Sequence, residues 1–412
     1  MFNFRLLRGA DFSLWVCAGI LLMFGFFAIF SATGSNDPAS GGAFKFIIRH
    51  FWSLAAAITF MLFCAYLNYK HWASINWLLY GIMLVLLAMV LVKGFAAMGA
   101  QRWLTLGFIS FQPSEISKLF LIVALAALLK DKIGKLDDLR SLIWPGVVFL
   151  VPFLLVFKQP DLGTALVMLA ITFCLLLYAG LSWEQLALLF TPVISVILCQ
   201  FFWLWLIYIV LLFLVLTFFR MSWFNLILTM LLNVGVGLAF PFVWDLLKEY
   251  QKQRIYTFFN PAADPLGAGY HTMQSEIAVG SGMLMGRGFL QGTQTQLHFI
   301  PIQYADFIFS VIGEEFGLLG GLTVLGVFLV MIWRMIYIAV SAPDTFGQLL
   351  GIGIAGMFIF HVTVNIGMTL GLLPIVGIPL PLLSYGGSAM FLNLGCIGVM
   401  QSIAMRREKL IF

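Results

Sequence analysis

One long connection in this hydrophobic chain, Trp244–Gly317, holds several of its 17 acidic residues. These carboxylates include Asp264, Glu276, Asp306, Glu314 and Glu315. The stretch Asp264–Tyr270 is rich in glycine and proline, which allow tight turns and close backbone approach to a ligand. A carboxylate placed there can take a proton from a hydroxyl group as a general base. Asp264 is therefore the catalytic candidate, although an aspartate before a proline can also be a turn former.

Cationic side chains near the ends of other hydrophobic stretches are candidates for binding an anionic group. Arg102 and Lys118 are the stronger candidates, and Lys158 and Arg287 are weaker ones. The carboxylates of Glu115 and Asp161 and the hydroxyl group of Ser384, which lie in polar segments of the same kind, complete the predicted substrate-binding set. That set is Arg102, Glu115, Lys118, Lys158, Asp161, Arg287 and Ser384.

These residues also have structural interpretations. Glu115 and Lys118 stand three residues apart, which is the spacing of an ion pair on one helix face. Lys158 and Asp161 can instead cap the helix that follows them. Neither alternative is excluded by the sequence, but ionisable residues within apolar stretches are costly and are functional candidates by default.

Other polar residues in apolar surroundings favour structural roles. His361 and Asn365 stand four residues apart and are predicted to form hydrogen bonds between helices. Glu314 and Glu315 can favour a helix N-terminus. No histidine has metal-ligand spacing, so the ligands of any metal are unknown. The cysteines are interpreted as small buried apolar residues: Cys17, Cys64, Cys174, Cys199 and Cys396.

The composition indicates an integral membrane protein. The 412 residues are 62% hydrophobic and 9% charged, whereas a soluble domain has about 25% charged residues. The net charge of +5 requires no nucleic-acid partner, because the positions of charges matter more than their sum in such a chain. Arg5 and Arg8 precede the first apolar run, which lacks a convincing cleavage site and is expected to remain as a span.

About twelve segments are long enough to span a membrane as helices of roughly 20 residues. The uncharged run Leu186–Phe219 would measure about 50 Å as one helix, so two spans that turn near Gln200 fit better. The expected starts are near Phe12, Phe46, Ile75, Pro113, Ser141, Leu162, Leu186, Leu204, Asn225, Leu318, Gly347 and Gly387.

The positive charges support this count, since they collect in loops on one side. The expected architecture is an all-α polytopic membrane protein, one domain over 1–412, with both termini cytoplasmic and an extracytoplasmic catalytic loop at 244–317. Within that loop, Asp245–Phe259 suits a helix at the membrane interface, and Tyr270–Met285 suits a short helix or re-entrant element. Four polar clusters, at residues 101–118, 158–164, 244–317 and 379–388, are then expected on the outer face.

Several motifs recur in order along almost the whole chain. They are Gln101–Trp103, Phe111–Glu115, Gln159–Gly163, Asp264–Tyr270, Asp306–Phe309 and Leu383–Gly387. Through them the sequence resembles the SEDS family (shape, elongation, division and sporulation) of bacterial membrane proteins. Gln291–Leu297 resembles the RodA branch, which serves elongation, rather than the FtsW division branch.

The resemblance implies a peptidoglycan glycosyltransferase in the bacterial cytoplasmic (inner) membrane. Its substrate would be lipid II, a disaccharide-peptide on undecaprenyl diphosphate, and its partner a class B penicillin-binding protein. The essential loop aspartate of the family matches Asp264. Two departures stand out: two spans more than the family usually has, and a Pro301–Asp306 segment without the Glu, His and Thr often found there.

The chemistry of that reaction agrees with the residues. A base takes the proton of the acceptor hydroxyl, cations neutralise the departing diphosphate, and an apolar groove would hold the polyprenyl tails. A divalent cation, Mg²⁺ or Mn²⁺, could share the neutralisation, and no other cofactor is expected. The alternatives are a lipid II flippase or transporter, which would also use charged residues in its bundle, and a non-catalytic cell-wall scaffold.

Overall fold

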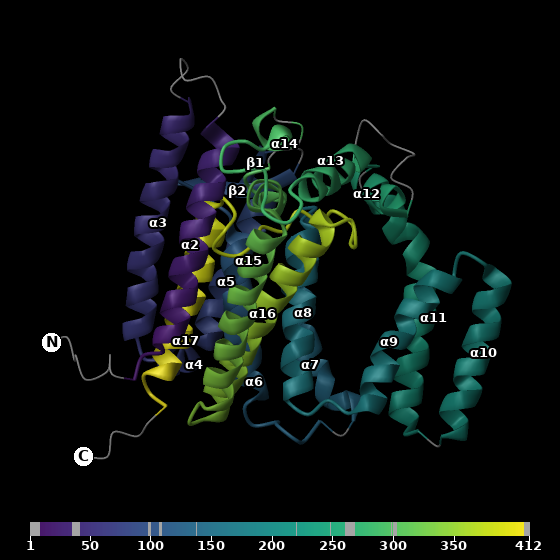
Figure 1. The fold of residues 1–412 in the computed structure, drawn as a ribbon. Coiled ribbons are helices and arrows are strands. Elements are labelled where there is room, and N and C mark those ends of the chain that lie inside the picture. The colour runs from purple at the N-terminus through teal and green to yellow at the C-terminus, as the bar shows by residue number, and fades with distance from the viewer. Residues whose placement is uncertain are drawn as a thin grey trace, which may run out of the picture.

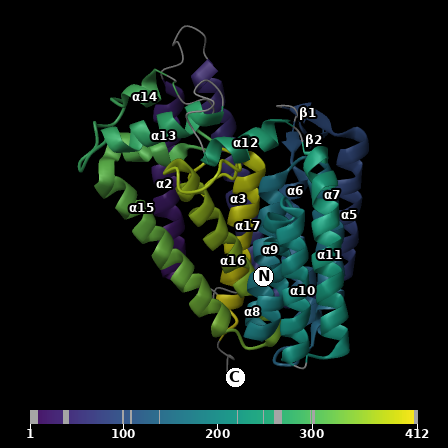
Figure 2. The same ribbon diagram turned by 90° about the vertical axis from the view of Figure 1, so that its right-hand side faces the viewer.

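The molecule is a bundle of long helices that run between two ends (Figure 1). This computed structural model describes residues 9–34, 42–97, 100–106, 109–136, 138–219, 221–247, 249–259, 268–297, 299 and 303–407. Figures 1 and 2 both place the small sheet and the helices α12, α13 and α14 at one end of the bundle, which is called the upper end below. The opposite end is called the lower end.

A helix lies at each segment that was predicted to span the membrane. In chain order they are α2 (Phe12–Gly34), α3 (Gly42–Tyr66), α5 (Asn76–Lys93), α6 (Pro113–Leu129), α7 (Ile143–Lys158), α8 (Leu162–Tyr178), α9 (Trp183–Leu198), α10 (Phe202–Phe218), α11 (Trp223–Leu246), α15 (Ile308–Val340), α16 (Thr345–Thr369) and α17 (Gly387–Ala404). The run Leu186–Phe219 is divided between two helices, as predicted. The largest boundary error is α15, which begins at Ile308 rather than near Leu318.

Length and composition support a multi-pass membrane protein. In the described residues eight helices are long and apolar enough to cross a membrane, and α8, α9 and α10 are apolar but shorter. The eight include all the other long helices except α6, which carries Glu115 and Lys118 in its first turns. The number of twelve crossings stays a prediction.

Helices α16 and α17 form the centre of the bundle. Their most apolar windows are 78% and 89% buried, against 17–39% for the other six membrane-length helices. Glycines let the neighbours of α16 approach closely: a Cβ at Gly351 or Gly353 would lie 2.6 Å from Ala339 or Ile122. Close packing of small residues of this kind is a main source of helix association in membranes.

Helices α9, α10 and α11 form a layer at one side of the bundle (Figure 1, right). A polar network joins them: Tyr208 donates to the carbonyl of Thr191 at 2.8 Å and to Asn233 Oδ1 at 3.1 Å. Trp205 Nε1 donates to Ser195 Oγ at 2.6 Å. Hydrogen bonds between helices specify one packing of side chains that are otherwise apolar.

A small antiparallel sheet, which the all-α prediction missed, connects α5 and α6 at the upper end. Its strands are β1 (Phe95–Ala97), β2 (Ala100–Leu106) and β3 (Ile109–Phe111), in the order β1-β2-β3. Leu104 of β2 lies opposite Phe111 of β3. The strand pairing provides hydrogen-bond partners for backbone N–H and C=O groups of this connection, which a hydropathy pattern describes only as a loop.

Short helices account for the remaining regular structure. They are α4 (Tyr69–Ser74), the 3₁₀ helix η2 (Leu139–Leu142), α12 (Glu249–Phe259), α13 (Ala268–Ser281) and α14 (Thr293–Gln296). The two helices expected within the long connection are thus present as α12 and α13, although α11 already extends to Leu246.

Helix α15 is broken at Gly317, whose φ of 65° lies in the left-handed region. The backbone of Met283–Gly288 fills the break. Its N–H groups donate to the carbonyls of Glu314–Glu315 at 2.9 and 3.1 Å, and its carbonyls accept from the N–H groups of Leu318–Leu319 at 2.8 and 3.2 Å. The helix therefore changes direction without leaving these backbone groups unsatisfied.

At the lower end, Asp11 ties the start of α2 to two other helices. Its N–H donates to Gln401 Oε1 at 2.9 Å, and Gln401 Nε2 donates to its carbonyl at 2.8 Å. Arg334 of α15 forms an ion pair with the Asp11 carboxylate. These contacts clamp α2, α15 and α17 at the end opposite the polar clusters.

Candidate active site

The four polar segments singled out in the sequence meet at the upper end. Three contacts join them: Arg102 with Asp161 (3.7 Å), Gln112 with Ser388 (3.1 Å) and Tyr304 with Tyr385 (2.9 Å). The prediction that the clusters share one face is confirmed for the described residues.

Asp161 connects the starts of two helices. Its Oδ1 caps α8 by accepting from the N–H of Thr164 at 3.4 Å, and its Oδ2 accepts from the Thr164 hydroxyl at 2.9 Å. Ser114 and Gln112, at the start of α6, donate to the same Oδ2 at 3.0 and 3.2 Å. Only 4% of Asp161 is exposed. The predicted capping role is confirmed, and the carboxylate is placed to hold Arg102 rather than to bind a ligand itself.

Arg102 of β2 is half-buried beside Asp161. One terminal nitrogen of its guanidinium lies 3.7 Å from Asp161 Oδ1, and the other donates to the carbonyl of Pro160. Its Nε is buried and has no hydrogen-bond partner among the described residues. Since a buried donor without a partner is costly, this nitrogen is suited to bind a ligand oxygen.

Glu115 and Lys118 form an ion pair inside the bundle. Lys118 Nζ lies 2.9 Å from Glu115 Oε2 and 3.4 Å from His361 Nε2, and the other ring nitrogen of His361 lies 3.2 Å from the carbonyl of Pro379. Only 1% of Lys118 is exposed. The geometry favours the structural interpretation of this pair over direct contact with a diphosphate, and it confirms His361 as an interhelical residue.

Asp306 lies in the turn before α15 and is half-buried. Asn365 Nδ2 donates to the carbonyls of Asp306 and Ile378 at 2.9 and 2.7 Å, so it fixes the turn before α15 and the segment after α16 rather than joining two helices as predicted. Burial raises the pKa of the Asp306 carboxyl, whereas the guanidinium groups of Arg254 and Arg102 act in the opposite direction. Both guanidinium groups therefore favour the charged form of this carboxyl group.

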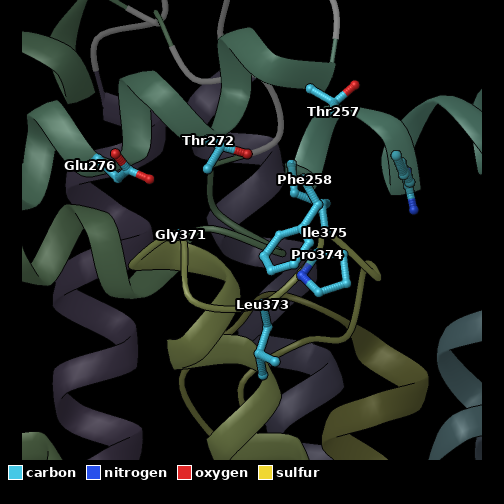
Figure 3. A pocket seen from close by; sticks show the side chains of 9 residues that line it. Thr257, Phe258, Thr272, Glu276, Gly371, Leu373, Pro374 and Ile375 are labelled. Atoms are coloured by element: carbon cyan, nitrogen blue, oxygen red, sulfur yellow. The ribbon is translucent and has the colours of Figure 1, made fainter. Parts of the chain in front are cut away.

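A cavity of about 30 Å³ lies between α12, α13 and the segment after α16 (Figure 3). Arg254 and Thr257 line it from α12, and Thr272 and Glu276 from α13. Glu276 Oε1 lies 1.9 Å from the place of a Cβ on Gly371, which only glycine permits. The other lining residues are Phe258, Leu373, Pro374 and Ile375. The space suits a water molecule or one small polar group rather than a sugar.

The predicted catalytic residue Asp264 lies outside the described residues. It belongs to the connection between α12, which ends at Phe259, and α13, which begins at Ala268. Both flanking helices line the cavity and stand at the upper end.

The remaining predicted binding residues differ in their surroundings. Lys158 is exposed in the last turn of α7, two residues before Pro160. Arg287 is exposed and donates to the carbonyl of Ser281 at 3.3 Å and to Thr293 Oγ1 at 2.7 Å, within the segment that fills the break of α15. Ser384 is 4% exposed, and its hydroxyl accepts from the N–H of Leu380 at 2.8 Å.

Two conclusions follow for these three residues. Lys158 stays near the Arg102–Asp161 pair, whereas the contacts of Arg287 and Ser384 stabilise local turns. Arg254 is not among the predicted site residues, because its charge suits a helix at the membrane interface. Its neighbours in the cavity lie on other elements, and no local signal could have indicated them.

Metal binding receives no direct support from the described residues. Among them, no group of three His, Cys, Asp or Glu side chains lies close enough to hold a metal ion. The five cysteines form no disulfide. Cys17, Cys64 and Cys396 are buried as predicted, whereas Cys174 and Cys199 are only partly buried.

The fold and this polar upper end define a multi-pass helical membrane protein with an arginine- and carboxylate-rich site beside a long connection. The model of a family described as "Cell cycle protein", FTSW_RODA_SPOVE, matches residues 11–207 and 193–409. The chain belongs to this family of FtsW, RodA and SpoVE proteins.

Particular relatives cover nearly the whole chain. The peptidoglycan glycosyltransferase MrdB of Escherichia coli (strain K12) is 36% identical over 90% of this chain and 89% of its own length. The peptidoglycan glycosyltransferase RodA of Treponema pallidum (strain Nichols) is 32% identical over 96% and 98%. A solved structure described as "Structural coordination of polymerization and crosslinking by a peptidoglycan synthase complex" matches with a TM-score of 0.71 at 28% identity, over 97% of this chain and 98% of that one.

Proposed function

We propose that this chain is a peptidoglycan glycosyltransferase that polymerises lipid II into glycan strands during cell elongation and shape maintenance. The observation that carries the proposal is the similarity to named peptidoglycan glycosyltransferases, at 32–36% identity over 90–96% of the chain. The site supports it, since it gathers cations and carboxylates at the end where the catalytic loop begins. The Gln291–Leu297 motif favours the elongation branch.

The proposed reaction transfers a glycan chain from one undecaprenyl diphosphate to the hydroxyl of the next lipid II. Asp264 takes the proton of the attacking hydroxyl. Arg102, oriented by Asp161, neutralises the departing diphosphate, and Lys158 adds positive charge at the edge of the same site. Glu115 and Lys118 hold α6 in place beneath it.

A divalent cation stays part of the proposal. Mg²⁺ or Mn²⁺ bound to the substrate diphosphate would reduce the charge that the arginines must neutralise. The described residues provide no complete ligand set, so no step is assigned to the ion.

The proposed partner is a class B penicillin-binding protein, which crosslinks the new strands. The similarity to a chain of a peptidoglycan synthase complex supports it. Photo-crosslinkers at Leu322 and Leu329, which are exposed on α15, are expected to capture the membrane helix of the transpeptidase. Crosslinks confined to α2 and α3 would move the partner surface to the first helices.

The proposed orientation places both termini in the cytoplasm and the upper end outside. Single cysteines at Gln200 and Phe219, at opposite ends of α10, test it in a background without the native cysteines. We expect an impermeant thiol reagent to label Gln200→Cys from outside and Phe219→Cys only from inside, because α10 crosses the membrane. Labelling of both from the same side would contradict the two-span interpretation.

Polymerisation of lipid II by the purified protein in detergent tests the proposed function. The reaction needs no second compartment, so a flippase or a scaffold would give no strands in this assay. The clustering of the charged residues at the upper end, rather than at mid-depth, favours surface chemistry over transport.

A further inference from the structure

Arg254 is half-buried on α12 and lines the cavity of Figure 3. Thr272 lines the same cavity, whereas the hydroxyl group of Thr257 already donates to the carbonyl of Gln253 at 2.6 Å. A guanidinium with a hydroxyl group beside it provides donors that bind phosphate oxygens.

Gly377 shows how closely Arg254 approaches Asp306. A Cβ at Gly377 would lie 3.5 Å from Asp306 Oδ2 and 3.8 Å from Arg254 Nη1. The φ of 74° places this glycine in the left-handed region, where other residues are strained. The carboxylate and the guanidinium therefore lie against the same short piece of backbone, which Asn365 fixes through the neighbouring carbonyl of Ile378 at 2.7 Å.

Arg102 reaches the same region from a different element, β2: its partner Asp161 lies two residues before Gly163, and a Cβ at Gly163 would lie 3.5 Å from the carbonyl of Gly377. Arg102 has a buried Nε without a partner in the part of the chain that the structure describes. A guanidinium has five N–H donors, and a carboxylate accepts two of them in a bidentate pair. Arg102 thus contacts Asp161 and the carbonyl of Pro160 and still presents a donor to a ligand.

We propose that Arg254 is a second diphosphate-binding residue, which acts together with Arg102, and that Asp306 is the positioning residue for Arg254. This inference rests on the proposed function, since the ligand is the diphosphate ester of a polyprenol. Glu276 borders the cavity on the side of α13 and would repel an anion there. Asp306 is also an anion, but the positive charges of Arg254 and Arg102 act against its charge, so the diphosphate binds on the side of Arg254 away from Glu276.

The test measures binding separately from polymerisation. Undecaprenyl diphosphate, which carries no sugar, is titrated against the purified protein and its variants, and initial rates are measured over a range of lipid II concentrations. We expect Arg254→Ala to weaken binding of undecaprenyl diphosphate about 10- to 100-fold, as loss of a hydrogen bond to a charged group predicts. KM for lipid II should rise, and Arg254→Lys should recover only part of the affinity.

Asp306→Asn and Arg102→Ala complete the series. Asp306→Asn is expected to weaken binding of undecaprenyl diphosphate less than Arg254→Ala does. Because Asp306 acts through Arg254, the double variant Arg254→Ala/Asp306→Asn should bind this ligand no more weakly than Arg254→Ala alone. Arg102→Ala should resemble Arg254→Ala. Lys252→Ala is the matched control, since it removes a cation from the same helix, one paired with Glu249 at 3.2 Å.

The outcomes separate the inference from the proposed function. Unchanged affinity of Arg254→Ala for undecaprenyl diphosphate, with reduced thermal stability, would show that Arg254 has a purely structural role and would overturn the inference. The proposed function would stay intact in that case if the parent protein polymerises lipid II. A parent protein that neither binds undecaprenyl diphosphate nor polymerises lipid II would overturn both. If Arg254→Ala does not fold, Arg254→Gln carries the same comparison.

Discussion

Purified Asp264→Asn protein is expected to fold, insert and bind its partner, yet to polymerise lipid II about 100- to 10,000-fold more slowly than the parent chain. Asparagine keeps the shape of the side chain but cannot accept the proton of the acceptor hydroxyl. Asp264→Glu moves the carboxylate by about 1 Å, and a displacement of that size costs on the order of 100-fold. Strand synthesis from lipid II, measured beside thermal stability, checks both variants.

Asp245→Asn is the matched control, because it makes the same chemical change at an exposed position near the end of α11. It should polymerise like the parent chain. Full activity in Asp264→Asn would place the base elsewhere. Asp306 and Glu276 would then be tested next, since they are carboxylates near the cavity, whereas Asp161 is already occupied by four donors.

Lys118→Ala is expected to destabilise the folded protein by about 3–5 kcal/mol, because it leaves Glu115 as a buried charge without its partner. Only 1% of Lys118 and 5% of Glu115 is exposed. The loss should reduce the thermal midpoint of the purified protein, and activity should fall mainly through the loss of folded molecules. Thermal unfolding and activity per folded molecule separate the two effects.

The double variant Glu115→Gln/Lys118→Met is the control for this interpretation. It removes both charges while keeping side chains of similar size, and replacement of a whole buried ion pair is often close to neutral. We expect it to recover most of the lost stability. Normal stability of Lys118→Ala together with weak binding of undecaprenyl diphosphate would instead assign Lys118 a direct role with the substrate.

Hydropathy and charge were sufficient to predict the long helices. They also predict where an apolar run must turn, because a run that is too long for one membrane crossing has to be divided into two helices. The uncharged run Leu186–Phe219 was divided correctly for this reason. The start of α15 was misplaced because its first turns contain Glu314 and Glu315, which a hydropathy pattern assigns to a loop. Glu314 is fully buried, because the N–H groups of Gln294 and Thr295 satisfy it at 2.8 and 2.9 Å.

The site was predicted only in part, because the sequence indicates residue types but not how distant elements pack together. Residue types and motifs indicated Arg102 and Asp161, but their pairing depends on how β2 packs against the start of α8. Lys118 was predicted to bind an anion, and only packing shows that its ammonium group is enclosed. Arg254 was missed because Asp306 and Gly377, its neighbours in space, lie far along the chain.

The broken helix α15 imposes an order on assembly. Met283–Gly288 is synthesised before Leu318–Leu319, so the segment that closes the break leaves the ribosome before two of its hydrogen-bond partners exist. Until they follow, its backbone groups must remain hydrated, and the opened turn at Gly317 cannot enter hydrocarbon at low cost. The outer connection and α15 therefore mature as one unit during membrane insertion. A tag inserted between residues 283 and 288 would arrest that step, whereas the exposed turn at Gln200 lies outside the unit and can carry one.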